Sequence, residues 1–433
     1  MIRTIFSILT VCCAGAVALP ACAQTEQAPQ TLTLAQAHAI AVQNEPRLLS
    51  AQYQAAAARA ITSEERSAYY PQVFGDLTGA DAENNSRIAA GALNNPIIYT
   101  RYANGIEATQ LVTDFGRTHS RVASANFEAK SQQQSAEATR ADVLLNVDQA
   151  YFRALAAQAV LKVAQQDVDA RQAVADQVGE LAKNKLRSSL DVSFANVNLA
   201  QGKLFLIQAR NEFQAAEAGL SLALGDTNGG AYQLQDEPLP PAPTGDVAAL
   251  IAQAYQQRPE LAGSRFHVQS AQEHSRAEAE LWLPTLSAAG AAGLTPVREA
   301  PLDDRYAAAG FNLSIPIFNG RLYEARHAEA SAEESAANQD MIELQDQIAH
   351  DVRVARLNAN TAYDRLAVTQ ELLDQATQSL QLAQARYDLG LSSIVELSQA
   401  ELNQTQAQVS NAQANYDFQT AISALSFAVG TLR

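Results

Sequence analysis

The residues that could do chemistry in this chain are few and poorly placed for it. Of the six histidines, only His267 and His274 lie close together, and their spacing along one helix separates them by about 10 Å, too far to bind one zinc ion as neighbours. The paired acids Asp303–Asp304 and Glu333–Glu334 are typical of a solvated surface. The sequence contains no phosphate-binding loop and no nucleophile elbow. We therefore expect neither an enzyme nor a bound metal or cofactor.

A more informative pair of acids, Asp191 and Glu396, stands 205 positions apart. Pro46 and Pro259 are separated by a similar distance, 213 positions, and the residues around the members of each pair match in type and order. A repeat of this length exceeds the roughly 20–50 residues of a solenoid unit and indicates a duplicated structural half. Each acid then occupies the same place in its half. Near a helix start, a carboxylate is also favourable as an ordinary solvated residue, so the position alone leaves both interpretations open.

The duplication defines the expected organisation of the chain. Long tracts rich in Ala, Gln, Leu and Glu, with little Gly or Pro, predict long helices, and short alternating segments between them predict strands. We expect a leader at 1–23; a first repeat at 24–225, with strands at 72–81 and 102–111 and a helical hairpin at 117–224; a linker at 226–245; and a second repeat at 246–433, with strands at 285–295 and 306–315 and a hairpin at 321–429.

The long helices carry a heptad seam. Apolar or small residues advance by four and three from Leu344 to Tyr387, and again from Val143 to Val168. This spacing predicts coiled-coil packing, and by itself it would equally suit an ordinary antiparallel coiled coil.

The leader indicates the compartment. A charged start, an apolar stretch too short to span a membrane and the sequence Ala21–Cys22–Ala23 predict a bacterial secretory signal peptide over 1–23, with lipidation of Cys22 as the alternative. All three cysteines lie in this region, so the mature chain has no disulfide. Its 29 basic and 46 acidic residues, after loss of Arg3, disfavour nucleic acid as a partner. No apolar run of about 18 residues follows the leader, so we expect no helical membrane span.

The strand segments suit a membrane instead. Each is about ten residues long, the length that a tilted strand needs to cross a bilayer. Aromatic residues stand where the strands begin and end, as in the girdles of membrane barrels, and we expect these to contact outer-membrane lipid: Tyr69, Tyr70, Trp282, Phe115, Phe318 and Tyr306.

Four strands cannot close a barrel, and an open edge in hydrocarbon leaves costly unpaired backbone groups. The missing strands must come from other copies of the chain. Three copies give twelve strands and leave an interior passage. The expected fold class is therefore mainly α with a membrane β-barrel part: a homotrimer with a 12-strand β-barrel continued by a 12-helix periplasmic α-barrel.

The ordered motifs resemble the TolC family of outer-membrane efflux and secretion channels. They are Asp114–Phe115–Gly116–Arg117, Pro316–Ile317–Phe318–Asn319–Gly320, and Arg386–Tyr387–Asp388–Leu389–Gly390 followed by Ile394–Val395–Glu396–Leu397. The resemblance covers essentially the whole mature chain. It implies an outer-membrane channel of a tripartite efflux or type I secretion system, which passively conducts substrates from an inner-membrane pump or ABC exporter and a periplasmic adaptor to the exterior. The alternative is a periplasmic coiled-coil adaptor or scaffold without a pore.

The resemblance also implies a periplasmic gate. Asp191, Glu396 and Tyr387 match the family's pore acids and tyrosine, whereas Ser392 stands in place of its arginine and Gln399 in place of a second acid. A Tyr387–Asp191 hydrogen bond could then close the gate, with Arg187 or Arg386 as the only source of charge assistance.

Two turns are expected to dock the adaptor. The first comprises Asn184, Lys185 and Leu186, and the second comprises Leu389, Gly390 and Leu391. Lys185 stands where a glycine would best tolerate a positive φ.

Overall fold

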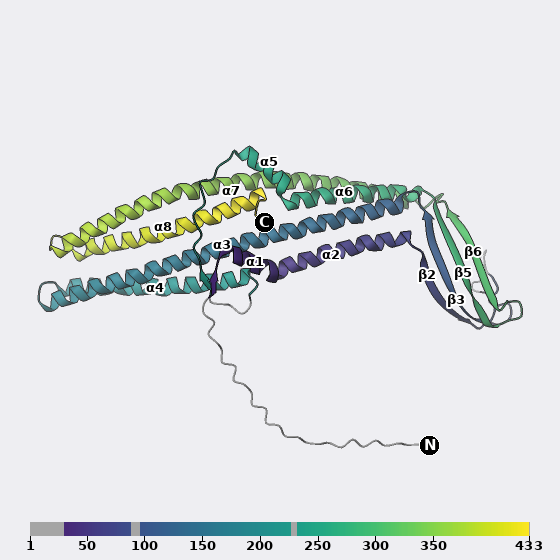
Figure 1. The fold of residues 1–433 in the computed structure, drawn as a ribbon, viewed down its shortest axis with the longest axis horizontal. Helices are drawn as coiled ribbons and strands as arrows, with labels where there is room; N and C mark the ends of the chain where they lie inside the picture. The colour runs from purple at the N-terminus through teal and green to yellow at the C-terminus, as the bar shows by residue number, and fades with distance from the viewer. Residues whose placement is uncertain (1–29, 88–95, 227–231, 433) are drawn as a thin grey trace, which may run out of the picture.

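The computed structural model describes residues 30–87, 96–226 and 232–432 (Figure 1). The expected signal peptide lies outside these ranges. The first half contains α1 (Leu34–Asn44), α2 (Pro46–Arg66), the short 3₁₀ helix η1 (Ser67–Tyr69), β2 (Gln72–Ala80), β3 (Arg101–Thr113), α3 (Arg117–Lys183) and α4 (Ser189–Ala223). The second contains α5 (Val247–Gln257), α6 (Pro259–Ala279), η2 (Glu280–Trp282), β5 (Thr285–Arg298), β6 (Arg305–Ser314), α7 (Leu322–Asp388) and α8 (Ile394–Val429).

The two halves correspond residue by residue. Helices α3 and α7 both have 67 residues, and each residue of α7 lies 205 positions after its counterpart. Helices α2 and α6 both have 21 residues, offset by 213. The strands obey the same two offsets, since Gln72 pairs with Thr109 and Thr285 pairs with Ser314.

Each half bends at a proline. Pro46 and Pro259 occupy the first positions of α2 and α6, where the missing backbone N–H costs nothing. The residue before each proline is extended, with ψ of 116° at Glu45 and 121° at Arg258, because the proline ring disfavours helical geometry there.

The protein is long and thin, with a four-stranded antiparallel sheet at one end and the tips of two helical hairpins at the other (Figure 1). The strand order is β2-β3-β5-β6, so β2 and β6 are the edges of the sheet. Helices α2, α3, α6 and α7 lie side by side in the same order between sheet and tips (Figure 1). None of the described helices is both long and apolar enough to pass through a bilayer.

The sheet has one apolar and one polar face. Paired residues share a face, and Leu77, Ile106, Phe311 and Leu313 all lie on the first. The second carries Asp76, Glu107 and Asn312, together with the ring of Tyr306, which lies over Gly293 and Gly105. This alternation is the pattern of a membrane barrel strand.

Strands β3 and β5 are longer than expected. Strand β3 extends to 101–113 because it pairs on both sides, with β2 and β5. Strand β5 continues to Arg298, beyond the expected end at 295, and includes Pro296. The register shifts opposite this segment, between Tyr102 and Asn104. A bulge accommodates the proline, which cannot donate a ladder hydrogen bond.

The core of the helical part follows the heptad seams. None of the seam positions between Leu344 and Tyr387, or between Val143 and Val168, is exposed. Together with the sheet, these coiled-coil pairs confirm the mainly α fold with two duplicated halves, each of two strands and one helical hairpin.

A small parallel sheet was not predicted. Strands β1 (Gln30–Leu32) and β4 (Tyr232–Leu234) pair beside α3. The hydroxyl of the fully buried Tyr151 donates to the carbonyls of Leu32 and Gln235, at 2.8 and 2.7 Å. These strands are only three residues long, so no alternation signals them in the sequence.

Candidate functional site at the helical tips

The two tip turns have the same backbone geometry. Helix α3 ends at Lys183 and the amides of Lys185 and Leu186 donate to the carbonyls of Ala182 and Leu181, both at 2.9 Å. Helix α7 ends at Asp388, and Gly390 and Leu391 make the equivalent bonds to Tyr387 and Arg386, at 3.0 and 2.8 Å. This is the Schellman ending, which requires a left-handed residue.

The left-handed residues are Lys185, with φ of 61°, and Gly390, with φ of 73°. Lysine in this conformation carries a Cβ that crowds the following carbonyl, at a cost of roughly 1–2 kcal/mol. The two tips are therefore equal in shape and unequal in backbone strain.

Asp191 and Glu396 both lie in the first turn of the returning helix. Ser188 caps α4: its hydroxyl accepts from the amide of Asp191, and the Asp191 carboxylate accepts from the amide of Ser188, both at 3.1 Å. Ser393 caps α8 by accepting from the amide of Glu396 at 3.4 Å. Within one copy of the chain, both acids thus act as helix-start residues.

Tyr387 and Arg187 join the two tips. Tyr387 is 1% exposed and lies in an apolar cluster contributed by both hairpins. The Arg187 guanidinium lies 4.2 Å from the centre of the Tyr387 ring, and its Nη2 donates to the Tyr387 carbonyl at 2.8 Å. Burial raises the pKa of the Tyr387 hydroxyl above 10.0; Arg187 opposes this shift and Asp191 adds to it. The Arg187 guanidinium therefore contacts both the ring and the backbone carbonyl of Tyr387.

The Tyr387–Asp191 hydrogen bond is absent from this structure. The Tyr387 hydroxyl is buried and has no hydrogen-bond partner, and the Asp191 carboxylate accepts from the backbone amide of Ser188 instead. That bond is not formed within one copy and stays a prediction for the closed channel. Of the two arginines that we considered, Arg187 binds the tyrosine, whereas Arg386 pairs with Glu396, with Nε and Oε1 at 3.4 Å.

The remaining gate candidates lie nearby but do not join this network. The Ser392 hydroxyl is buried without a hydrogen-bond partner. Gln399 is exposed and donates to Asn403 along its own helix at 3.0 Å. Neither replaces the arginine or the second acid of the resemblance.

The outermost surface of the tips is apolar. Leu186 and Leu389 are 69% and 75% exposed, and Leu391 is 67% exposed. Asn184 and Lys185 are also exposed. Large aliphatic side chains gathered on an exposed end are typical of a protein-binding surface.

A buried polar layer above the tips was missed by sequence reasoning. Asp167 and Arg171 on α3 form an ion pair, with Oδ2 and Nε at 2.8 Å, and the Thr405 hydroxyl of α8 donates to Asp167 at 2.7 Å. Glu401 of α8 is also buried, at 8% exposure. Burial raises the pKa of Glu401 above 4.5; Arg171 opposes the shift and Asp167 adds to it. This layer connects the two hairpins. A glycine inside helix α4, Gly202, could have indicated this layer from the sequence, because a Cβ at that position would lie only 3.0 Å from the Arg171 side chain.

The expected membrane-interface aromatics are all exposed. Their exposed fractions range from 40% at Trp282 to 81% at Phe318. Five of them lie where helices meet strands: Tyr69, Tyr70 and Trp282 before β2 and β5, and Phe115 and Phe318 after β3 and β6. Tyr306 lies at the far end of the sheet, near the start of β6, and its ring lies on the polar face rather than on the apolar face expected to contact lipid.

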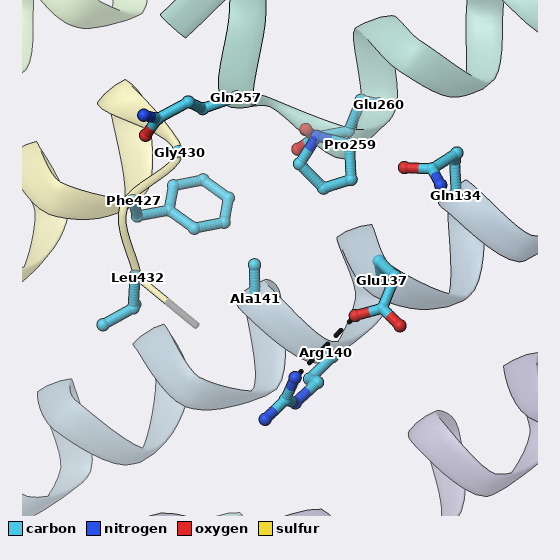
Figure 2. Close-up of a pocket in the computed structure, with 10 residues that line it drawn as sticks. All are labelled: Gln134, Glu137, Arg140, Ala141, Gln257, Pro259, Glu260, Phe427, Gly430 and Leu432. Carbon is cyan, nitrogen blue, oxygen red and sulfur yellow. Dashed lines mark ion pairs between the residues drawn. The ribbon is translucent and has the colours of Figure 1, made fainter. Parts of the chain in front are cut away.

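One cavity lies beside the bend between α5 and α6. The cavity in Figure 2, about 350 Å³, lies between α3, the α5–α6 bend and the end of α8. Its walls include the rings of Pro259 and Phe427, and the Glu137–Arg140 ion pair at 3.8 Å. Among the described residues, no group of three or more His, Cys, Asp or Glu side chains is placed to hold a metal.

Comparisons with known proteins agree with this architecture. Residues 39–226 and 250–431 match the family described as "Outer membrane efflux protein". The chain is 24% identical over 410 residues to "Outer membrane protein TolC" of Vibrio cholerae, covering 92% of this chain and 91% of that one. Among solved structures, the CmeC outer membrane channel of Campylobacter jejuni has a TM-score of 0.79 at 18% identity, covering 92% and 85% of the two chains. The open state of the MtrE outer membrane channel of Neisseria gonorrhoeae has a TM-score of 0.76 at 18% identity, covering 92% and 89%.

Proposed function

Because the chain belongs to the outer membrane efflux protein family, we propose that three copies form one conduit, closed as a strand barrel in the outer membrane and as a helical barrel in the periplasm. The observation that carries this proposal is the pair of open edges. Strands β2 and β6 and helices α2 and α7 lie at the margins of the protomer in the same order. A sheet edge in hydrocarbon requires pairing, and identical copies joined edge to edge provide it at every margin.

Conduction in this proposal is passive. The sequence has no phosphate-binding loop, so energy comes from an inner-membrane pump or ABC exporter, and a periplasmic adaptor changes the equilibrium between closed and open tips. The chain supplies the path and the gate of an efflux or type I secretion assembly. Its location is the outer membrane, extending into the periplasm.

The proposed gate is formed by the tips of the hairpins. Asp191 and Glu396 lie at the start of the returning helices in both repeats, so three copies would place six carboxylates around the periplasmic entrance. A ring of carboxylates favours cations in a pore. Arg187 and the buried Tyr387 hold the two hairpins of each copy together at the same level.

Single-channel recording in planar bilayers tests the gate. Combined Asp191→Asn and Glu396→Gln substitution is expected to reduce cation preference and change conductance. Glu371→Gln serves as the control, because Glu371 is exposed on α7, 16 residues from Tyr387, or about 24 Å along the helix. Identical currents from the double variant and the unmodified protein would exclude a pore-lining role. A purified mature chain that stays monomeric without detergent would exclude the channel and favour a periplasmic scaffold.

The adaptor is proposed to dock on the exposed tip leucines. Leu186 and Leu391 would enter grooves between the hairpins of the adaptor, with Lys185 beside them contributing charge. Replacing both leucines with Ser is expected to abolish co-purification of the adaptor while the trimer persists in detergent. Unchanged co-purification would place the docking surface elsewhere.

A further inference from the structure

The internal repeat allows the contact between two copies to be inferred from a contact within one copy. Within one copy, α3 of the first repeat packs against α6 of the second. The counterpart of α3 is α7, offset by 205, and the counterpart of α6 is α2, offset by 213. Helices α7 and α2 lie at opposite margins of the protomer (Figure 1). If repeats alternate around a closed ring, the α3–α6 contact must recur between α7 of one copy and α2 of the next.

The internal contact is closely packed. Glu128 Oε2 lies 3.0 Å from His267 Nδ1, and the rings of Phe127 and Phe266 stack with their centres 6.5 Å apart. A Cβ on Gly263 would lie 3.3 Å from the Gln134 Cβ. Small residues at this face allow the helices to approach closely.

The counterpart faces are uncovered. Adding 205 to Phe127, Glu128 and Gln134 gives Ala332, Glu333 and Gln339, all of which are exposed on α7. Subtracting 213 from Gly263, Phe266 and His267 gives Ser50, Tyr53 and Gln54, all of which are exposed on α2. Tyr53 is 75% exposed, an unusual state for an aromatic side chain whose counterpart is stacked.

We propose that α2 of one copy packs antiparallel against α7 of a second copy in the register set by the repeat, with Tyr53 against Ala332, Gln54 against Glu333, and Ser50 against Gln339. This inference rests on the proposed trimer and adds its residue-level register.

The side-chain chemistry at these positions is complementary. The Gln54 amide can donate to the Glu333 carboxylate, as the His267 ring does to Glu128. On α7 the mapped face carries the exposed acids Glu329, Glu333, Glu343 and Asp346. Within one copy, Glu260 of α6 and Ala141 of α3 line the same cavity. The counterpart of Glu260 on α2 is the exposed Arg47, and the counterpart of Ala141 on α7 is Asp346. The repeat therefore places Arg47 at the level of Asp346. Arg47, which also pairs with Glu45 of its own copy at 2.7 Å, would therefore lie close to an acid of the second copy.

The cavities support the same register. The cavity in Figure 2 is closed on one side by Gln134, Arg140 and neighbouring residues of α3. The cavity at the first bend includes the counterparts Pro46, Arg47, Leu222 and Gly225 and is larger, about 840 Å³ against 350 Å³. Its missing wall corresponds to Gln339, Ile342 and Gln345 of a second copy. Leu222 is 79% exposed and Ile342 46% exposed, and both would line the cavity once it is closed by the second copy.

The sheet gives an independent check. The β3–β5 pairs Ile106↔Ala292 and Ala108↔Gly290 map to Phe311↔Gly79 and Leu313↔Leu77 between β6 of one copy and β2 of the next. All four residues of the mapped pairs lie on the apolar face. A slip by one residue would bring Leu313 opposite Asp76 or Thr78 and reverse the faces.

Disulfide cross-linking tests the register. Ser50→Cys combined with Gln339→Cys occupies positions whose counterparts place their Cβ atoms 3.3 Å apart, close to disulfide geometry. The control, Ser50→Cys with Ala332→Cys, lies on the same face but seven residues away, or about 10 Å, beyond reach of a disulfide. The sequence has no cysteine after Cys22. Both variants are oxidised in detergent and analysed on non-reducing gels, with particle mass measured by light scattering.

Each outcome distinguishes the register from the trimer. Covalent oligomers from the Ser50/Gln339 variant and none from the control support the register. Trimeric particles without that cross-link, or with equal cross-linking of the control, overturn the register and leave the proposed channel intact. Monomeric particles overturn the proposed channel itself. As a second measurement, Gln54→Glu should weaken the trimer through charge repulsion, and added Glu333→Gln should restore it; a trimer that is insensitive to Gln54→Glu would contradict the pair.

Discussion

Replacing Lys185 with glycine should make the first tip more stable. Lys185 has φ of 61° and its backbone amide donates to Ala182. Removing its Cβ relieves roughly 1–2 kcal/mol, and the greater freedom of glycine in the unfolded chain offsets about 0.5–1 kcal/mol. The expected net gain is about 0.5–1 kcal/mol, since leaving the turn geometry unchanged preserves both of its hydrogen bonds.

Hydrogen exchange of the tip amides measures this gain locally. With 1.4 kcal/mol equal to a factor of ten, the amides of Lys185 and Leu186 should exchange about two to five times more slowly in Lys185→Gly. The matched variant is Gly390→Ala at the second tip. No atom lies within 4 Å of a Cβ built there, so its cost is conformational only, and Leu391 should exchange faster by a similar factor.

The result that would refute this reasoning is specific. Faster exchange at the first tip in Lys185→Gly would mean that the lysine side chain stabilises the turn through contacts outweighing its backbone strain. Unchanged exchange in both variants would mean that the Schellman hydrogen bonds do not limit opening of the tips.

Two further predictions concern the contacts between the hairpins. Arg187→Gln removes the guanidinium that lies 4.2 Å from the centre of the Tyr387 ring and should make this ring more accessible to iodination and to quenching of tyrosine fluorescence. Arg187→Lys should restore only part of the protection, because a lysine cannot stack as a plane. Unchanged accessibility in Arg187→Gln would contradict the role of the stack. For Glu401, a raised folded-state pKa means that stability is fully present below the unfolded value of 4.5 and is lost as pH rises through the folded value. Glu401→Gln should therefore stabilise the hairpin contact at neutral pH and flatten the pH dependence of hydrogen exchange in α8 above pH 4.5; an equally steep dependence would assign it to another group.

The sequence predicted the helices well for clear physical reasons. The long proline-free tracts and their heptads, from Val143 to Val168 and from Leu344 to Tyr387, leave no competing structure over α3 and α7, and Pro46 and Pro259 stand at first helical positions, where proline is well tolerated. The sheet was predicted from alternation, but the extension of β5 through Pro296 depended on a bulge against β3 that only pairing reveals.

The site was less predictable because its contacts are tertiary. Asp167 and Arg171 stand four residues apart, a spacing that ordinarily indicates an exposed helical ion pair, yet α8 covers them through Thr405. Similarly, the hydrogen-bond partner of Asp191 is its own capping serine, Ser188. Local capping competes with a long-range bond, and a residue pattern cannot show which one is formed.

Helices α3 and α7 have equal lengths and therefore set equal lengths for the two hairpins. Each spans 67 residues, or about 100 Å, so both hairpins reach the same depth in the periplasm. In the proposed trimer, a rim built from such tips is level, and the proposed adaptor would meet it as a flat ring. Deleting one heptad from α3 and α4 alone would shorten the first hairpin by about 10 Å, so that its tip would no longer be level with the second and every contact with the adaptor would tilt. The same deletion in both hairpins would shorten the tube and keep the rim level.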